Sequence, residues 1–188
     1  GLSVYDKNKD SVFTYIAKGP IQIGAAVTSV TGDKEGNVWV TSFGGVYEID
    51  PKTKELITSD KFSSINNELA GKVSLSFLQD KKHRIWVGAG NGLYLFNLAT
   101  GEVKLFRHDD GDENSLADDE VNAIVEDAQG NIWAGTSKGL SMWIPGTNQF
   151  RNITHTKGTV RISSNRIYTL AGDSLNQLWI GTDEGLDI

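Results

Sequence analysis

The chain has 188 residues, a formal net charge of -6 and a pI near 5.0, with 38% hydrophobic and 22% charged residues. The acidic balance argues against direct nucleic-acid binding, because phosphate contact needs a basic face. The absence of cysteine excludes disulfides, thiolate metal sites and a cysteine nucleophile. No apolar run approaches the ~18 residues that a membrane helix needs, so we expect no membrane contact here. The chain begins with Gly1 rather than Met, so we expect a piece of a longer protein.

Read from its N-terminus, the chain repeats one phrase four times. In each copy an aspartate stands six residues before a tryptophan, and a glycine stands six residues after it. These structural repeat positions are Asp33, Trp39 and Gly45, Asp80, Trp86 and Gly92, Asp127, Trp133 and Gly139, and Asp173, Trp179 and Gly185. The tryptophans are 47, 47 and 46 residues apart. A repeat at this fixed period indicates stacked copies of one small structural unit.

Each period has the texture of four short strands joined by turns. In the third copy we expect strands over 121–125, 131–135, 140–143 and 149–151, with turns at 127–130, 137–139 and 145–148. No helical periodicity is evident in any copy. The pattern therefore predicts an all-β fold made of four-stranded antiparallel blades of a β-propeller.

The ends of the chain fall inside blades, because residues 1–5 match 139–143 and residues 185–188 stop at the same phase. We expect a single β-propeller segment over 1–188 with about four blades. The predicted phases are 1–26 (last two strands of a blade), 27–72, 73–119, 120–165 and 166–188 (first three strands). The segment is open or completed by another chain. A composite blade in a four-bladed ring, a homodimeric eight-bladed ring and further blades of the parent protein would each cover the ends. We favour association with further blades, from a second copy or from the parent chain.

The phrase D-x-x-G-N-I-W-x-G-T-x-x-G-L, carried by residues 127–140, resembles the two-component regulator propeller repeat. Residues 173–186 are similar to it nearly as closely, and residues 114–116 look like the inter-blade linker of the family. The first two copies depart from the pattern in their turns. Thr41 replaces a glycine, Ala89 replaces a threonine, and His83-Arg84 replace Gly-Asn.

The resemblance implies a function that composition and spacing do not. Members of the family are periplasmic sensor regions of hybrid two-component histidine kinases in gut Bacteroidetes. It implies two seven-bladed propellers, an immunoglobulin-like domain, one membrane span, and then kinase, receiver and DNA-binding modules. It also implies oligosaccharide input, a phosphorelay and transcriptional output. By resemblance, this chain is a non-catalytic, carbohydrate-sensing segment in the periplasmic portion of an inner-membrane protein.

The repeated aspartates and tryptophans favour structural roles over chemistry. An aspartate that recurs at the same phase of every blade is typical of a turn, and four separate blades cannot supply one close carboxylate pair. A tryptophan at the same phase in each blade is expected to pack between sheets rather than to stack on sugars. Trp143, which breaks the pattern, is also expected to pack.

Ligand specificity is expected in loops that the copies do not share. The candidate loops are 63–67, 108–114 and 155–157, and the candidate ligand-binding residues are His108, Asp110, Asp112, Asn114 and His155. Residues 108–114 fail the EF-hand template, in which Ser115 would stand at the glycine and Val121 at the glutamate. Because the three histidines lie in separate blades without ligand spacing, we predict no catalytic residue, metal site or cofactor.

Two other classes of function compete with the sensor. A propeller enzyme that resembles streptogramin lyase needs histidine and acidic groups that converge on a channel mouth. The histidines here are expected to fall on loops that do not correspond between blades, which disfavours such an enzyme. A protein–protein interaction scaffold is the third alternative.

Overall fold

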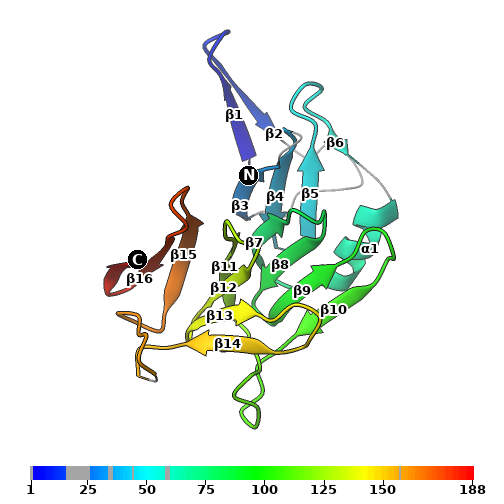
Figure 1. Cartoon of the computed structure of the whole chain (residues 1–188). Coiled ribbons are helices and arrows are strands. Elements are labelled where there is room, and N and C mark those ends of the chain that lie inside the picture. Colours follow the sequence, from blue (N-terminus) through cyan, green and yellow to red (C-terminus); the bar gives the residue numbers. More distant parts are fainter. Residues whose placement is uncertain (1, 16–25, 34–35, 44, 58–59, 157) are drawn as a thin grey trace. The chain divides into compact units, whose positions relative to one another are not determined.

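The computed structural model describes residues 2–15, 26–33, 36–43, 45–57, 60–156 and 158–188. Within these residues the regular structure is β, apart from one helix (Figure 1). The chain divides into two compact units, residues 1–74 and residues 75–188. Among the described residues, no helix is long and apolar enough to cross a membrane.

The first unit holds a two-stranded sheet and a four-stranded sheet. The two-stranded sheet pairs β1 (Leu2–Asp6) with β2 (Ser11–Tyr15). The four-stranded sheet runs in chain order through β3 (Val27–Gly32), β4 (Val38–Ser42), β5 (Gly45–Ile49) and β6 (Leu56–Ile57). All of these pairs are antiparallel. Val40 and Ile49 of the second sheet form a small core with Leu2.

The helix α1 (Asp60–Leu69) corrects the expectation that no helical pattern is present. It packs on β5, with Ile65 and Leu69 buried, and Asn66 Oδ1 accepts the backbone N–H of Val46 at 2.8 Å. After the helix, Gly71 adopts a φ of +72°, a left-handed conformation that ends helices at low cost. Two buried positions four residues apart are too few to show a helical period, and this is why the pattern missed it.

The second unit contains two four-stranded sheets and one three-stranded sheet. The first has β7 (Ser74–Gln79), β8 (Ile85–Ala89), β9 (Gly92–Phe96) and β10 (Val103–Phe106). The second has β11 (Val121–Glu126), β12 (Ile132–Thr136), β13 (Leu140–Trp143) and β14 (Phe150–Ile153). The third has β15 (Ile167–Gly172), β16 (Leu178–Thr182) and β17 (Gly185–Asp187).

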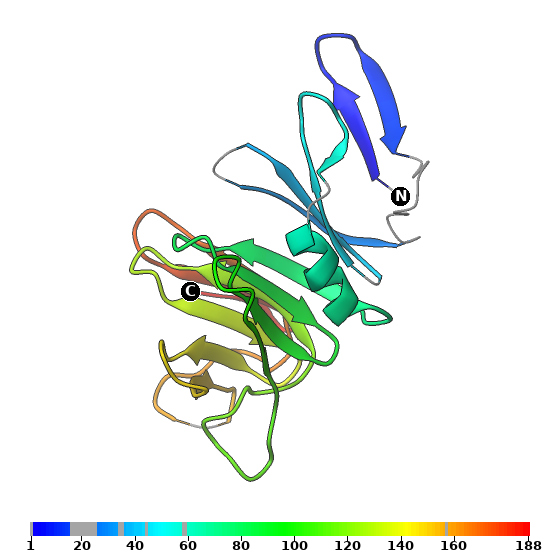
Figure 2. The same cartoon turned by 90° about the vertical axis from the view of Figure 1, so that its right-hand side faces the viewer.

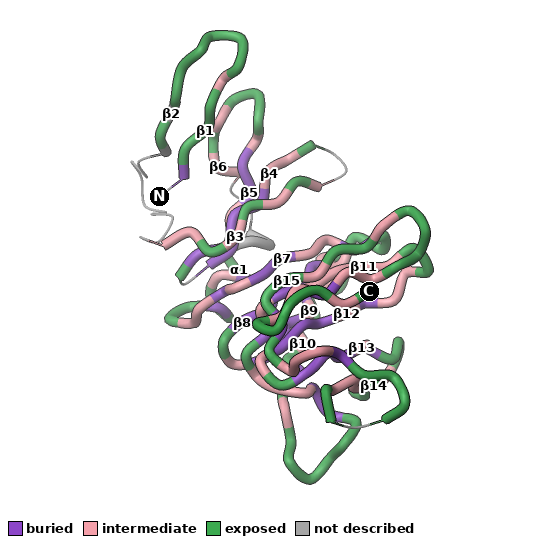
Figure 3. Tube along the Cα trace, turned by 90° about the vertical axis from the view of Figure 1, so that its left-hand side faces the viewer, coloured by how far each residue is buried: buried purple, intermediate pink, exposed green. Residues whose placement is uncertain are grey.

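Each sheet is an up-and-down meander of neighbouring strands, as a propeller blade requires. The predicted all-β fold of antiparallel propeller blades is therefore confirmed. In the described residues the sheets have two, four, four, four and three strands in chain order. Figure 3 shows that burial concentrates in the second and third strands of the blades of the second unit, such as β8, β9 and β12.

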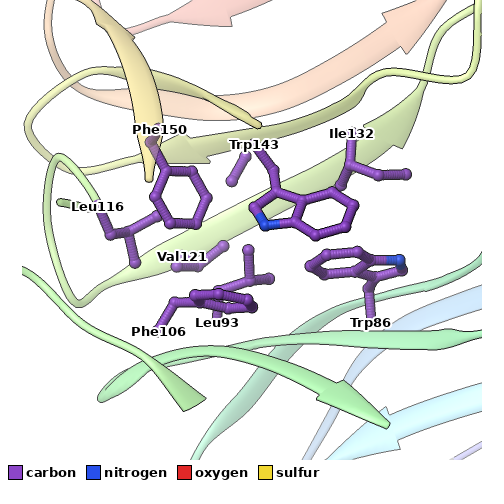
Figure 4. Packing of buried hydrophobic residues seen from close by; sticks show 9 residues of the cluster. Trp86, Leu93, Phe106, Leu116, Val121, Ile132, Trp143 and Phe150 are labelled. Carbon is purple, nitrogen blue, oxygen red and sulfur yellow. The ribbon is translucent and has the colours of Figure 1, made fainter. Parts of the chain in front are cut away.

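An aromatic core joins the second and third four-strand blades of the chain (Figure 4). The rings of Trp86 and Trp143 meet edge to face with centroids 5.0 Å apart, and Phe106 stacks on Trp86 at 6.1 Å. Phe150 meets Phe106 at 5.4 Å in a second edge-to-face pair. Trp143 is only 5% exposed, so its expected packing role is what the structure shows. Aromatic pairs in this geometry stabilise the core beyond the area that they bury.

The last sheet packs on its predecessor through a close approach at a glycine. β15 lies against both β11 and β12. A Cβ on Gly135 would come within 2.5 Å of the Ile167 side chain. Leu140, Ile162, Ile167 and Ile180 form the core at this junction, with Trp133 beside it. Glycine two residues after the tryptophan thus makes room for a β-branched side chain of the next blade.

Candidate functional site

The four repeated aspartates are each bonded to the tryptophan six residues later. In every copy the indole Nε1–H donates to the aspartate Oδ2 at 2.9 Å. The other carboxylate oxygen accepts the backbone N–H four residues after the aspartate, at 2.8 to 3.0 Å. The carboxylate therefore fixes both the turn and the ring orientation. Sequence reasoning identified the turn but missed the bond to the indole.

Hydrogen bonding lowers the pKa of two of these carboxyl groups. For Asp127, burial acts to raise the pKa, but bonds from Trp133 and Asn131 together outweigh it. For Asp173, the bond from Trp179 is the main cause of the lowered pKa, followed by the backbone N–H of Gln177. Both aspartates are thus stable as anions whose acceptor sites are already used. That favours a structural role over acid–base chemistry.

The altered turn of the second copy keeps the same geometry. His83 adopts a left-handed φ of 57°, where Gly36 and Gly130 have 88° and 87°. Arg84 Nε donates to Asp80 Oδ2 at 2.7 Å, and so takes the place of the amide that Asn131 offers to Asp127. The Arg84 guanidinium also lies over the rings of Trp86 and Trp143, at 5.4 and 5.0 Å from their centroids. The substitution therefore changes the chemistry of the turn and not its path.

In the first copy, Thr41 stands at the repeat position that Gly135 occupies in the third copy. A hydroxyl network is found there in place of the close approach of a side chain to glycine. Thr41 is fully buried, and its hydroxyl pairs with that of Thr28 at 2.9 Å. The Thr28 hydroxyl donates in turn to the Ser74 carbonyl. The departure at Thr41 thus buries a hydroxyl group whose hydrogen bond is supplied by Thr28, at an exposed position of β3.

The loop between β10 and β11 (residues 107–120), which projects from the sheets in Figure 2, carries most of the candidate ligand-binding residues. At its start, His108 Nδ1 lies 2.7 Å from the Leu116 carbonyl and Nε2 lies 2.9 Å from Asp110 Oδ1. The backbone N–H of His108 donates to Asp119 Oδ1 at 2.7 Å. These contacts, the Leu116 carbonyl first and Asp110 second, raise the pKa of His108.

His155 repeats this arrangement in the next blade. Its Nδ1 lies 3.1 Å from the Ile162 carbonyl, and its backbone N–H donates to Asn165 Oδ1 at 2.6 Å. His108 and His155 are 47 residues apart, the period of the repeat, and hold equivalent linkers. The expectation that these histidines lie on loops that do not correspond is therefore wrong. The spacing itself was the signal that could have revealed the pair.

The acidic residues of the loop mostly fix its own backbone. Asp112 Oδ1 accepts the N–H of Asn114, and Asp109 Oδ1 accepts the N–H of Gly111, both at 2.9 Å. The carbonyl of Asn114 accepts the N–H of Phe150 at 2.6 Å. The side chain of Asp110 is fully exposed. Of the predicted residues, the structure brings together His108 and Asp110 and leaves His155 in the following linker.

The two other predicted loops differ in outcome. Residues 63–67 are not a loop, because they belong to α1. Lys157, at the end of the loop 155–157, lies outside the described residues.

An open pocket of about 580 Å³ lies over β10 and the adjoining loop. Its lining includes the predicted residues His108, Asp110 and Asp112, and also Lys104, Arg107 and Asn148. Sequence reasoning missed these last three residues. Lys104 lies in the outer strand β10, Arg107 follows directly after that strand, and Asn148 comes from the β13–β14 turn, so nothing in the repeat marks them. The pocket therefore combines cationic, anionic and amide groups in one exposed place.

No group of three or more metal-ligating side chains converges anywhere in the described residues. What the pocket offers is a set of hydrogen-bond donors and acceptors without an enclosed cavity. Such a surface suits recognition of a polar ligand.

Two family models match the chain. The SMP-30/Gluconolactonase/LRE-like region matches residues 33–142, and the two component regulator propeller matches residues 161–184. No curated protein matches it.

Solved structures share the fold along almost the whole chain. The extracellular domain of a hybrid two-component system of B. thetaiotaomicron has a TM-score of 0.73 and 20% identity, and the match covers 99% of this chain and 24% of that one. A second such domain from the same organism has a TM-score of 0.67, 22% identity and coverage of 99% and 30%. Virginiamycin B lyase from Staphylococcus aureus has a TM-score of 0.60, 12% identity and coverage of 95% and 55%.

The chain thus spans 24% and 30% of the length of the two extracellular domains. The first family model covers more than half of this chain, and the second falls on the junction and strands of its last blade. The chain belongs to the SMP-30/gluconolactonase/LRE-like region family, and its residues 161–184 are similar to the two component regulator propeller.

Proposed function

We propose that this chain is a non-catalytic, extracytoplasmic sensor segment of a hybrid two-component histidine kinase. The observation that carries the proposal is the likeness to extracellular domains of hybrid two-component systems over 99% of the chain. The match of residues 161–184 to the two component regulator propeller supports it independently. The periplasm is the proposed location, and the parent protein is the proposed kinase.

We propose that the pocket over β10 binds an oligosaccharide. Lys104 and Arg107 offer donors, Asp109 and Asp112 offer acceptors, and Asn148 offers both. Sugar hydroxyls can pair with each kind of group. Binding would favour one of two arrangements of the parent sensor, and its differential affinity for them would set the kinase output.

The experiment replaces charged side chains of the pocket by neutral ones in the parent receptor and reads glycan-dependent transcription. The variant K104Q/R107Q/D112N removes three charges at the pocket and leaves neutral amides in their place. K7Q/K9Q/E102Q makes the same change of charge at exposed positions outside its lining and serves as the control. We expect the pocket variant to need at least about tenfold more ligand, since bonds to charged groups contribute about 1.5–3 kcal/mol each. A full response at unchanged ligand concentration, with normal receptor abundance, would reject the pocket.

A propeller enzyme is the second candidate, favoured by the likeness to virginiamycin B lyase and by the match to the gluconolactonase-like family. The described histidines weigh against it. His108 and His155 hold linkers, and His83 lies in a strained turn. Turnover of a streptogramin or a lactone by the purified chain, lost on substitution of His108 and Asp110, would favour the enzyme over the sensor.

We also propose that further propeller blades cover the outer face of the β15–β17 sheet, from the parent chain or a second copy. Leu186 is 62% exposed, whereas Leu140 at the same repeat position is 1% exposed. Gly135 receives Ile167 of the next blade, but the nearest atoms to a Cβ on Gly181 come from Thr169 of its own sheet. We expect the first strand of the next blade to pack there, with a β-branched residue at the position that Ile167 occupies in β15.

Thiol labelling tests this cover, because the chain has no native cysteine. Leu186→Cys should react readily in the isolated chain if it is monomeric, and slowly in a parent receptor otherwise freed of reactive thiols. A dimer in light scattering with slow labelling would assign the cover to a second copy. Equal and fast labelling in the monomer and in the parent would contradict the proposal.

A further inference from the structure

Both ring nitrogens of His108 face oxygens that can only accept hydrogen bonds. Nδ1 lies 2.7 Å from the Leu116 carbonyl, and Nε2 lies 2.9 Å from the Asp110 carboxylate. A carbonyl carries no proton, and an aspartate carries none at neutral pH. Both contacts are therefore hydrogen bonds only when the ring is protonated on both nitrogens. The neutral ring can donate to one of the two oxygens and must give up the other.

The two acceptors differ in how firmly the fold holds them. Leu116 is fully buried and belongs to the aromatic core between the two four-strand blades. Asp110 is fully exposed. The ring of His108, whose own backbone N–H is held by Asp119, thus joins a buried residue of the core to an exposed residue of the loop. Protonation of one ring decides whether that connection is complete.

The charged groups around His108 come from two elements. Asp110 and Asp119 lie on the same loop. Lys138 approaches from the β12–β13 turn, and its ammonium is paired with Asp118 at 2.8 Å. The hydrogen bonds to Leu116 and Asp110 raise the pKa of His108, while burial and the charge of Lys138 act against them, and the net direction is upward.

His155 supplies an internal comparison within the same fold. Its Nδ1 faces the Ile162 carbonyl in the same manner, and its backbone N–H is held by the neutral amide of Asn165. The position that corresponds to Asp110 is Lys157, which lies outside the described residues. The sequence therefore puts a carboxylate two residues after one histidine and an ammonium two residues after the other.

We propose that His108 is a pH-dependent latch, which fastens residues 109–113 to the blade when its ring is protonated and releases Asp110 when the ring is neutral. Because the pKa of His108 is raised, the latch is fully closed below its ordinary value of about 6.5. It opens as the pH rises through the higher value in the folded protein. Since Asp110 and Asp112 line the pocket over β10, opening changes the polar groups that the pocket presents. The proposal does not depend on what the pocket binds.

The test is an NMR titration of the imidazole rings in three forms of the whole chain. Asp110→Asn keeps the shape of the partner but removes its charge, so the pKa of His108 should fall. Asp112→Asn makes the same change of charge in the same loop, where its carboxylate bonds Asn114 instead of His108, and it is the matched control. Equal shifts of the His108 titration in both variants would overturn the latch.

Amide hydrogen exchange gives a second readout, made on the unaltered chain with His108→Gln as the control. After correction for the intrinsic effect of pH, residues 109–113 should lose protection as the pH rises through the His108 midpoint. His108→Gln cannot be protonated, and its loop should show no such step. Protection that is unchanged across the midpoint in the unaltered chain would contradict the proposal even if every variant folds normally.

Discussion

One carboxylate in each blade does the work of a turn residue and of a ring anchor. The Asp127 carboxylate accepts two bonds from Asn131 at 2.8 Å each and one from Trp133 at 2.9 Å. The turn and the second strand of the blade therefore share a single anion. Because these donors favour the charged form, the link between pH and stability has a defined direction.

We expect the anion of Asp127 to make folding weaken in acid. Its lowered pKa means that its contribution is complete above the unfolded value of about 3.9 and is lost as the pH falls through the folded value. Asp127→Asn should make the fall of the unfolding free energy between pH 5 and acid shallower, as urea denaturation at each pH would show. Trp133→Phe removes one of the donors to this carboxylate, so it should make the same fall of the unfolding free energy shallower to a smaller extent. An identical pH dependence in wild type and Asp127→Asn would show that this carboxylate does not contribute.

The turn at His83 is strained, and glycine should relieve it. A left-handed φ costs a residue with a side chain about 1–2 kcal/mol, whereas glycine loses about 0.5–1 kcal/mol of extra chain entropy on folding. His83 is exposed, so His83→Gly should stabilise the chain by about 0.5 kcal/mol, measured by urea denaturation. Gln129→Gly, at an exposed turn position without positive φ, is the control and should destabilise. Loss of stability in both variants would show that the turn at His83 holds no strain.

These residues also show what the sequence could and could not predict. The repeat predicted structural roles for the aspartate and the tryptophan, because both recur in every copy. It could not show that their side chains bond, since a spacing of six residues acquires that meaning only once two strands pair across a turn. The spacing of 47 residues between His108 and His155 indicates that the two positions are equivalent. The sequence did not show that the carbonyls of Leu116 and Ile162 would face their rings.

At the level of strands and blades, small residues face each other across the first and second strands of a sheet. Ala123 lies opposite Gly135, and Thr169 lies opposite Gly181, beside a register shift in each first strand. Such shifts bend the strand and increase its twist. Alternation and turn residues predicted the strands themselves. The helix α1 could not be predicted in this way, because contacts with β5 and not a helical period stabilise it.

We expect Gly135→Ala to loosen the junction between β12 and β15. Its methyl group would come within 2.5 Å of Ile167, which is fully buried and has little room to move. Overpacking of this kind costs about 1–3 kcal/mol, which thermal unfolding would detect. Gly90→Ala is the control, since nothing lies within 4 Å of its Cβ and its φ is not positive. Equal stability of the two variants would mean that the junction relaxes freely.

For the assembled protein, the exposed face of β15–β17 is the feature that other blades would complete. Leu140 and Leu186 occupy one repeat position in two blades but differ in exposure from 1% to 62%. The Leu140 side chain packs with Ile162, Ile167 and Ile180, whereas most of Leu186 faces water. In the isolated chain, the hydrophobic effect therefore stabilises the fold through the buried Leu140 and contributes little through Leu186.

We expect Leu140→Ala to cost about 2–5 kcal/mol of unfolding free energy, the usual range for a buried leucine. Leu186→Ala should change stability by less than about 0.5 kcal/mol in a monomeric chain, as surface substitutions do. If further blades cover the sheet, Leu186→Ala in the parent receptor should instead lower stability toward the cost at Leu140, because the same side chain is then withdrawn from water. Denaturant unfolding of both variants, in the chain and in the parent, measures all four values. A negligible cost at Leu186 in the parent, beside a large cost at Leu140, would leave that face exposed and would contradict the docking of another blade.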